Sequence, residues 1–326
     1  MIPIAKPLLG REEVEAASRV ILSGWVTQGP MVAQFEREFA ACVGACHAKA
    51  VSSCTAALHM ALLAVGVSPG DEVITVSHSF IATANAVRYC GAVPVFVDVQ
   101  PRTFNMDPLR LAEACTSKTR AILCVHQIGM PCDLKAILAF AREKSLPVVE
   151  DAACALGSEI DMGNGFERIG KPHGDIACFS FHPRKVITTG DGGMLTTNNA
   201  AYDEQFAHLR QHGMSVSDQV RHGASSVIFE SYPELGYNYR LTDIQASIGI
   251  EQLKRLSGIV ADRRKLAAKY NAELAGTAGI TLPLEPSWCR SNWQSYCVTL
   301  DDGVDQRQVM QALLDLGIRT RRGVMS

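Results

Sequence analysis

The stretch that decides the fold lies at residues 176–197 and reads IACFSFHPRKVITTGDGGMLTT. Two β-rich runs, 176–181 and 194–197, enclose a turn that contains Pro183, Lys185 and a cluster of glycines. Short apolar runs bounded by Pro- and Gly-rich turns are typical of strands. We therefore expect two strands here, joined by a turn that holds a lysine near the end of the first strand.

Similar β-rich runs recur on the N-terminal side of this stretch, and helical patterns separate them. The β-rich runs are 73–76, 94–97, 120–125 and 147–150. The helical patterns are 55–65, 81–89, 108–114 and 134–144, preceded by two more at 11–22 and 31–41. Apolar strands that alternate with helices of about three turns favour an α/β fold, in which a mostly parallel sheet is covered on both faces.

The pattern changes after Leu241. We predict two long helices, a strand and a further helix, at 241–256, 260–274, 295–300 and 306–316. This order is typical of an α+β arrangement. We therefore expect a large domain at 1–250 and a smaller C-terminal domain at 251–326, which would not yet be closed at residue 326.

The composition is that of an ordinary globular protein, with 326 residues, 47% of them hydrophobic, and a formal net charge of -2. No basic cluster with interleaved aromatic residues occurs, so a nucleic-acid partner is not expected. The first residues lack a basic region followed by a long apolar core, and no apolar run is long enough to span a bilayer. We therefore expect a cytoplasmic protein without a membrane partner.

The spacing closest to that of a metal site is formed by Cys42, Cys46 and His47. These residues lack a second pair of ligands, so no metal site is expected.

The stretch 51–58, VSSCTAAL, places small residues at the start of a predicted helix. The first N–H groups of a helix have no partner within it, and the helix dipole adds to their attraction for an anion. A phosphate group would therefore fit at this helix start. The same residues also suit an ordinary N-cap by Ser53 or Thr55, and both interpretations stay open on this stretch alone.

An acidic pair, Glu150 and Asp151, ends the apolar strand predicted at 147–150. Asp151 should emerge at the carboxyl edge of the sheet in a partly buried place, where an unpaired carboxylate is costly. A protonated pyridine nitrogen would serve as its cationic partner, and the carboxylate would keep that nitrogen protonated so that the ring can accept electrons. The alternative is that Asp151 caps the next turn.

Lys185 lies between an apolar strand and tight glycines. Most lysines are solvated surface charges, and that is the alternative interpretation here. A lysine enclosed by such flanks is expected to have a lowered pKa and so to be nucleophilic toward an aldehyde. The features at Thr55, Asp151 and Lys185 all fall near strand ends and helix starts, where open α/β sheets bind their ligands.

With these features in register, the chain resembles the DegT/DnrJ/EryC1/StrS aminotransferases. These are fold-type I enzymes that use pyridoxal 5′-phosphate (PLP) to aminate nucleotide-linked keto-sugars. The matching stretches, in the family's order, are GWVTQGPMVAQFEREFA (24–40), SSCTAALHMAL (52–62), SFIATANAV (79–87), GAVPVFVDV (91–99), EDAACALGS (150–158), FSFHPRKVITTGDGGM (179–194) and GYNYRLTDIQASIGIEQL (236–253). The resemblance implies a mostly parallel seven-stranded sheet flanked by helices, with a smaller C-terminal α+β domain.

The resemblance also implies roles for single residues. Lys185 would hold PLP as a Schiff base, Asp151 would pair with the pyridine nitrogen, and Phe80 would stack on the ring. Groups that would hold the phosphate come from Cys54, Thr55 and Ser180. Cys154 stands where the family often has Gln or His in contact with the ring hydroxyl, and a thiol is a weaker hydrogen-bond donor.

Asn238, in the stretch GYNYR, would reach the phosphate of the neighbouring subunit's cofactor. That role implies a homodimer with shared active sites. The implied reaction has two halves: an amino donor, expected to be L-glutamate, leaves its amino group on the cofactor, and a keto-sugar nucleotide then takes it up. Lys185 would move the proton in both halves, as general base and general acid.

Three other functions are compatible with parts of the pattern. A PLP-dependent sugar dehydratase typically has histidine in place of the lysine, so Lys185 disfavours it. An oxidoreductase with a nucleotide cofactor would need a glycine fingerprint after the first strand, and the glycines within 163–170 are too widely spaced. A non-catalytic PLP-binding regulator would keep the pocket without turnover.

Overall fold

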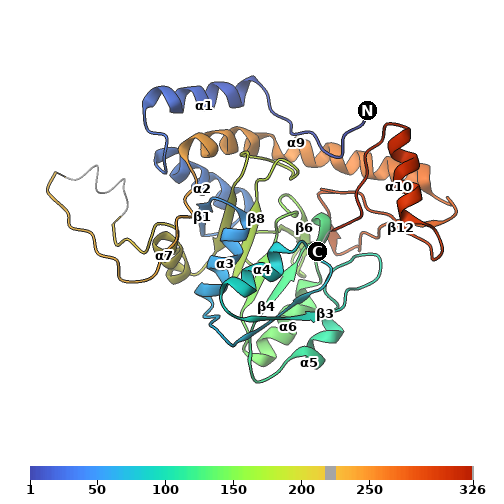
Figure 1. The fold of residues 1–326 in the computed structure, drawn as a ribbon, viewed down its shortest axis with the longest axis horizontal. Coiled ribbons are helices and arrows are strands. Elements are labelled where there is room, and N and C mark those ends of the chain that lie inside the picture. Colours follow the sequence, from blue (N-terminus) through green and yellow to red (C-terminus); the bar gives the residue numbers. More distant parts are fainter. Residues whose placement is uncertain (217–224, 325–326) are drawn as a thin grey trace.

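A seven-stranded sheet forms the centre of the molecule, which we describe from a computed structural model over residues 1–216 and 225–324 (Figure 1). The strand order is β1 (His47–Val51), β9 (Gly193–Thr197), β8 (Ile176–Ser180), β5 (Val148–Asp151), β4 (Thr119–Val125), β2 (Glu72–Val76) and β3 (Val93–Val97). Only β9 runs against its neighbours in this sheet, since β8, β5, β4, β2 and β3 pair in parallel. The predicted α/β fold with a mostly parallel seven-stranded sheet is confirmed.

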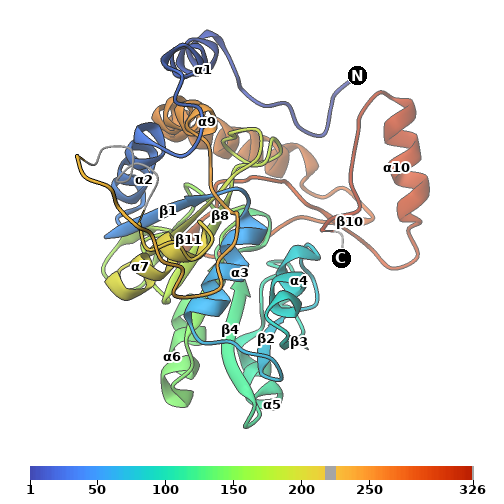
Figure 2. The same ribbon diagram turned by 60° about the vertical axis from the view of Figure 1, so that its left-hand side comes forward.

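Helices cover both faces of the sheet, as predicted (Figure 2). On one face, the core contains residues of α2 (Pro30–Val43), α5 (Leu111–Ala114), α6 (Leu134–Lys144) and α9 (Asp243–Leu274). On the other face, it contains residues of α3 (Cys54–Ala64), α4 (Ala82–Tyr89) and α7 (Ala200–Leu209). A one-turn helix, η1 (Pro108–Arg110), leads into α5, and α1 (Arg11–Ser23) packs on the outside of α9.

Strand β1 is missing from the sequence-based prediction. Its sequence, HAKAV, contains a lysine and two alanines, which are depleted in strands. In the structure Lys49 Nζ lies 2.7 Å from the Asp203 carboxylate of α7, so the charge is paired at the sheet edge. The ladder with β9, from His47 opposite Thr197 to Val51 opposite Gly193, supplies the backbone partners.

Helix α9 is one continuous helix of 32 residues, so the prediction of two helices with a break near residue 258 is wrong. Gly258 is exposed, and a glycine inside a helix costs only about 1 kcal/mol relative to alanine. The buried apolar residues Leu253, Leu256 and Val260 on either side outweigh that cost. The predicted domain boundary at residue 250 falls within this helix, and the division into two domains stays a prediction.

Small sheets and one helix follow α9. β11 (Cys289–Arg290) pairs with β6 (Glu159–Asp161), which also pairs with β7 (Phe166–Arg168). β10 (Ile280–Thr281) pairs with β12 (Thr299–Leu300), and α10 spans Gln306–Asp315. The strand predicted at 295–300 is therefore reduced to its last two residues, because Ser295 N donates to Ile128 O instead of to a strand ladder. Among the described residues, no helix is long and apolar enough to cross a membrane.

Candidate active site

The three predicted features meet at one edge of the sheet. In the ladders, Val51 of β1 lies opposite Gly193 of β9, and Gly193 lies opposite Ser180 of β8. Asp151, the last residue of β5, lies opposite Cys178 of β8. The loops that follow β1, β5 and β8 therefore leave the sheet side by side.

Gly193 sets how closely the start of α3 approaches this edge. A Cβ atom at Gly193 would lie 2.5 Å from Ser53 C and 2.7 Å from Cys54 N, distances that real Cβ contacts do not show. Only glycine therefore permits this approach. Sequence reasoning treated it as one of several turn glycines, and the turn pattern Gly190-Asp-Gly-Gly193 was the available signal.

The start of α3 combines the two interpretations that its sequence allowed. Ser53 is the N-cap, since its Oγ accepts a hydrogen bond from Ala56 N at 3.1 Å. Within the described residues, the N–H groups of Cys54 and Thr55 have no acceptor. Two donors at a helix N-terminus thus remain for an anion.

Asp151 is almost fully buried, with 6% of its surface exposed. Thr83 Oγ1 donates to one carboxylate oxygen at 2.9 Å, and Ala153 N donates to the other at 3.1 Å. Burial raises the pKa of Asp151 despite these hydrogen bonds and the nearby Lys185. Among the described residues, Asp151 forms no ion pair, so a cationic ring nitrogen would supply the partner that this carboxylate lacks.

Lys185 lies beside Cys154, with Nζ 3.0 Å from the sulfur atom. The turn is closed by a hydrogen bond from Lys185 N to His182 O at 2.8 Å. The prediction of a lowered pKa is wrong. Burial does lower the pKa of Lys185, but the acidic groups of Cys154, Cys54 and Asp151 outweigh it, and the net direction is upward.

The other predicted residues lie around the same edge. Phe80 precedes α4 and is 56% exposed, so its ring is not committed to the core. Ser180 ends β8, and its Oγ accepts a hydrogen bond from His182 N at 3.4 Å. Asn238 is exposed and lies opposite Gln211 in a β-bridge, without contact to Lys185.

A buried pair behind the site escaped sequence reasoning. His126 Nε2 lies 3.0 Å from the Glu150 carboxylate, and both side chains are fully buried. His126 Nδ1 accepts a hydrogen bond from Cys132 N, so Nε2 carries the proton and donates it to Glu150. This bond keeps the pKa of Glu150 low against the effect of burial. Because side chains alternate along a strand, Glu150 and Asp151 face opposite sides of β5.

The fold and the site define a class of protein. A lysine, a buried carboxylate without a cationic partner and a helix start with two open N–H groups converge at the carboxyl ends of parallel strands. These are the groups that PLP requires for its aldehyde, its ring nitrogen and its phosphate. The molecule is therefore a fold-type I PLP-dependent enzyme.

Comparison with known proteins agrees with this class. The model of the DegT/DnrJ/EryC1/StrS aminotransferase family matches residues 7–323, so the chain belongs to this family and is a PLP-dependent aminotransferase. The chain is 39% identical to the spore coat polysaccharide biosynthesis protein SpsC of Bacillus subtilis, over 96% of this chain and 80% of that protein. It is also 39% identical to the GDP-perosamine synthase of Caulobacter vibrioides, over 98% and 83%.

A solved structure supports both the fold and the cofactor. The sugar aminotransferase Spr1654 of Streptococcus pneumoniae in its PLP form, itself described as putative, superposes with a TM-score of 0.88 at 28% identity. The match covers 98% of this chain and 82% of that one. The chain thus belongs with aminotransferases of sugar biosynthesis.

Proposed function

We propose that this chain transfers an amino group from L-glutamate to the ketone carbon of a keto-sugar nucleotide. The observation that carries the proposal is the convergence of Lys185, Asp151 and the open start of α3 at one sheet edge. The class of acceptor rests on the relatives, one of which is named a GDP-perosamine synthase and another a spore coat polysaccharide biosynthesis protein.

When bound, PLP supplies an electron sink for the carbon that exchanges its amino group. Lys185 would hold the cofactor through Nζ, and after displacement by the amino donor the free amine would carry the proton to and from the reacting carbon. Asp151 would keep the ring nitrogen protonated, because a buried carboxylate is stabilised by a cation at hydrogen-bond distance. Thr83 holds that carboxylate in place through its 2.9 Å hydrogen bond.

The remaining residues would orient the cofactor. Phe80 would limit the tilt of the ring by stacking on it. Cys54 and Thr55 would bind the phosphate through backbone N–H groups, with Ser180 adding its hydroxyl. The thiol of Cys154 would face the ring hydroxyl, since its sulfur lies 3.0 Å from Lys185 Nζ.

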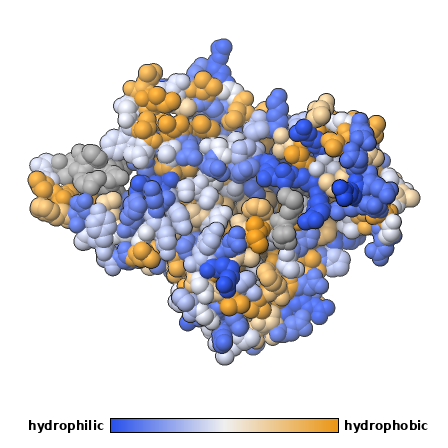
Figure 3. Space-filling model, viewed as in Figure 1, coloured by the Kyte–Doolittle hydropathy of each residue, from blue (hydrophilic) through white to orange (hydrophobic). Residues whose placement is uncertain are grey.

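We further propose a homodimer in which Asn238 completes the site of the partner subunit. Residues 225–235 extend away from the body of the molecule beside α7 (Figure 1). This arm exposes four large apolar side chains: Val227, Phe229, Tyr232 and Leu235. Apolar side chains also gather on the outside of α1, including Val14, Ile21 and Leu22 (Figure 3). Such patches are typical of subunit interfaces.

The proposal is tested with purified protein, PLP and the two substrates in turn. L-Glutamate alone should change the absorption band of the bound cofactor and release 2-oxoglutarate. A panel of keto-sugar nucleotides should then restore the band and yield an amino-sugar. Lys185→Ala should abolish turnover while PLP binding stays weak but detectable, because the phosphate and ring contacts remain.

The matched control is Lys265→Ala, which removes a lysine that is 77% exposed and distant in sequence from the site. It should behave as the wild type. Unaffected turnover in Lys185→Ala would refute the assigned role of the lysine. A wild-type protein that reacts with glutamate but with no keto-sugar nucleotide would refute the proposed acceptor alone.

A further inference from the structure

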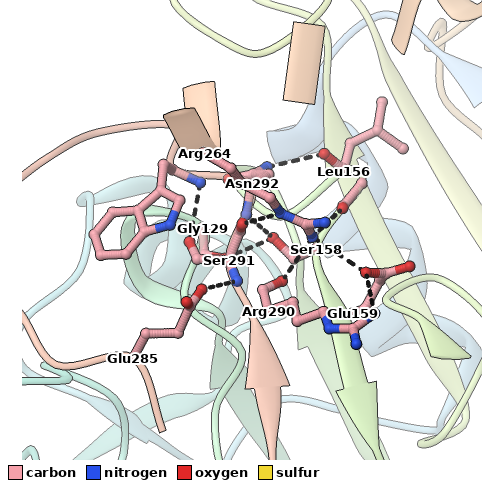
Figure 4. A network of polar contacts seen from close by, with 11 residues as sticks. Gly129, Leu156, Ser158, Glu159, Arg264, Glu285, Arg290, Ser291 and Asn292 are labelled. Carbon is pink, nitrogen blue, oxygen red and sulfur yellow. Dashed lines mark hydrogen bonds and ion pairs between the residues drawn. The ribbon is translucent and has the colours of Figure 1, made fainter. Parts of the chain in front are cut away.

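Asn292 is a fully buried residue whose side chain spans the loop after β5. Its Nδ2 donates a hydrogen bond to Cys154 O at 2.8 Å. It donates another to Leu156 O at 2.9 Å (Figure 4). Its Oδ1 accepts from Gln294 N at 2.8 Å, and its backbone N donates to Ser158 Oγ at 2.9 Å. Both amide hydrogens and the amide oxygen are therefore used, which fixes the orientation of the side chain.

The residues that follow Asn292 reach two more loops. Gln294 Nε2 donates to Arg184 O at 2.9 Å, in the turn that carries Lys185. The backbone N of residue 295 donates to the carbonyl of residue 128, in the loop after β4. Residues 292–295, which we call the clasp, thus join the loops that follow β4, β5 and β8, three neighbours in the sheet.

Two residues with a strained backbone lie where the clasp meets the β4 loop. Trp293 and Ile128 both have a φ of 51°, in the left-handed region that residues other than glycine rarely adopt. Gly129 has a φ of 98°, and a Cβ atom there would lie 2.1 Å from Asn292 Oδ1. Strained residues of this kind persist only where the surroundings hold them, and they cluster at functional sites.

Helix α9 holds the clasp from the outer side. Arg263 donates to Trp293 O at 3.3 Å and to Gln294 O at 3.1 Å. Arg264 Nε donates to Ser291 O at 2.9 Å, and its other nitrogen lies 3.2 Å from the Glu159 carboxylate (Figure 4). The clasp is therefore fixed to a long helix on one side and to the active-site loops on the other.

We propose that Asn292 is a positioning residue that sets the geometry between Lys185 and Asp151. Through Cys154 O it fixes the residue whose sulfur touches Lys185 Nζ at 3.0 Å, in the loop that Asp151 opens. Gln294 fixes the turn that carries Lys185, the other partner of this contact, through its hydrogen bond to Arg184 O. The proposal rests on the roles proposed above for Lys185 and Asp151, because those are the groups that the clasp aligns.

The test compares Asn292→Ala with Asn292→Asp in the PLP-loaded enzyme. Aspartate has the shape of asparagine but offers an acceptor to two carbonyl oxygens, so it should be the worse of the two. In both variants kcat should fall by about 10- to 100-fold, as a misplacement on the order of 1 Å can cause, while KM for L-glutamate stays unchanged. The visible circular dichroism of the bound cofactor, measured without substrate, should weaken, and the PLP dissociation constant should rise.

Asn271→Ala is the matched control, since Asn271 is an exposed residue of α9 that accepts a hydrogen bond from Tyr296 OH but does not contact the three loops. Its spectrum and kcat should equal those of the wild type. If the Asn292 variants do not fold, Gln294→Ala is tested in their place. Only the visible circular dichroism of its bound cofactor, without substrate, is then measured. Folded variants with wild-type spectrum, PLP affinity and kcat would overturn the proposal. A wild-type enzyme that shows no PLP band would instead overturn the proposed function.

Discussion

At the scale of single residues, the environment of Asp151 explains why a costly group is kept. A buried carboxylate without a cationic partner destabilises the fold, and its raised pKa expresses that cost. The two donors, Thr83 and Ala153, orient the carboxylate but do not neutralise it. In the proposed site, a protonated ring nitrogen would offset this cost, so the residue would suit the cofactor more than the empty fold.

Asp151→Asn should retain PLP but lower kcat by a factor on the order of 10²–10³, because the amide keeps the shape and loses the charge. Steady-state kinetics at saturating PLP measure this effect. Asp161→Asn is the matched control, since the Asp161 carboxylate accepts backbone hydrogen bonds from Gly163 and Gly165 in the turn after β6. Equal kcat values for Asp151→Asn and the control would exclude an electrostatic role for Asp151.

At the scale of elements, α9 organises the rest of the chain. Its first residue, Asp243, accepts hydrogen bonds from the backbone N–H groups of Gly29, Met31 and Val32, and so caps the start of α2. Farther along, Gln252 donates to Leu8 O and to Glu13 of α1. One helix thereby fixes two N-terminal helices that are distant in sequence.

The continuity of α9 leads to opposite predictions for two of its glycines. Gly258→Ala should stabilise the protein by about 0.5–1 kcal/mol, because a Cβ atom there meets nothing within 4 Å and alanine favours the helix. Gly249→Ala should destabilise it by about 1–3 kcal/mol, since the new Cβ atom would lie 2.6 Å from the ring of Phe35. Denaturant unfolding of both variants checks the pair. A destabilised Gly258→Ala would argue for a break in the helix at that point.

At the scale of the whole molecule, the arm at 225–235 and the apolar face of α1 are the surfaces on which the proposed homodimer rests. Asn238 follows the arm and lies next to the start of α3, because Ser52 N donates to Tyr239 O at 2.8 Å. It makes no contact with Lys185 of its own chain. These features suit a two-fold dimer in which the arm of one subunit reaches the site of the other.

Mixed dimers of Lys185→Ala and Asn238→Ala distinguish shared from separate sites. If Asn238 serves the partner's cofactor, a mixed dimer contains one intact site and one site with both changes. Activity at limiting PLP should then appear on mixing the two weakly active or inactive parents after subunit exchange. If each subunit instead supplies its own Asn238, every site in the mixed dimer keeps one defect, and activity stays at the level of the parents.

Much of this molecule can be predicted from local patterns. Strands β2, β3, β4, β5, β8 and β9 and helices α3, α4 and α6 follow from apolar periodicity and from turn residues, with ends displaced by one or two positions. The three-residue strands β6 and β7 were not predicted. Strand β1 could not be predicted, because its lysine and two alanines are depleted in strands and the ion pair of Lys49 with Asp203 is a tertiary contact. Asp151 and Lys185 could be selected as site residues from their position after apolar strands, whereas Thr83 and Asn292 carry no local signal.

The sequence by itself determined the alternation of strands and helices in the central sheet, the positions of Asp151 and Lys185 at or just after strand ends, and the family. It did so because periodicity, turn chemistry and motif order are properties of neighbouring residues. Only the tertiary structure decided the upward pKa of Lys185, the close approach at Gly193 and the clasp around Asn292. Each of these depends on groups far apart in the chain, whose distances and burial exist only once the sheet and α9 have brought them together.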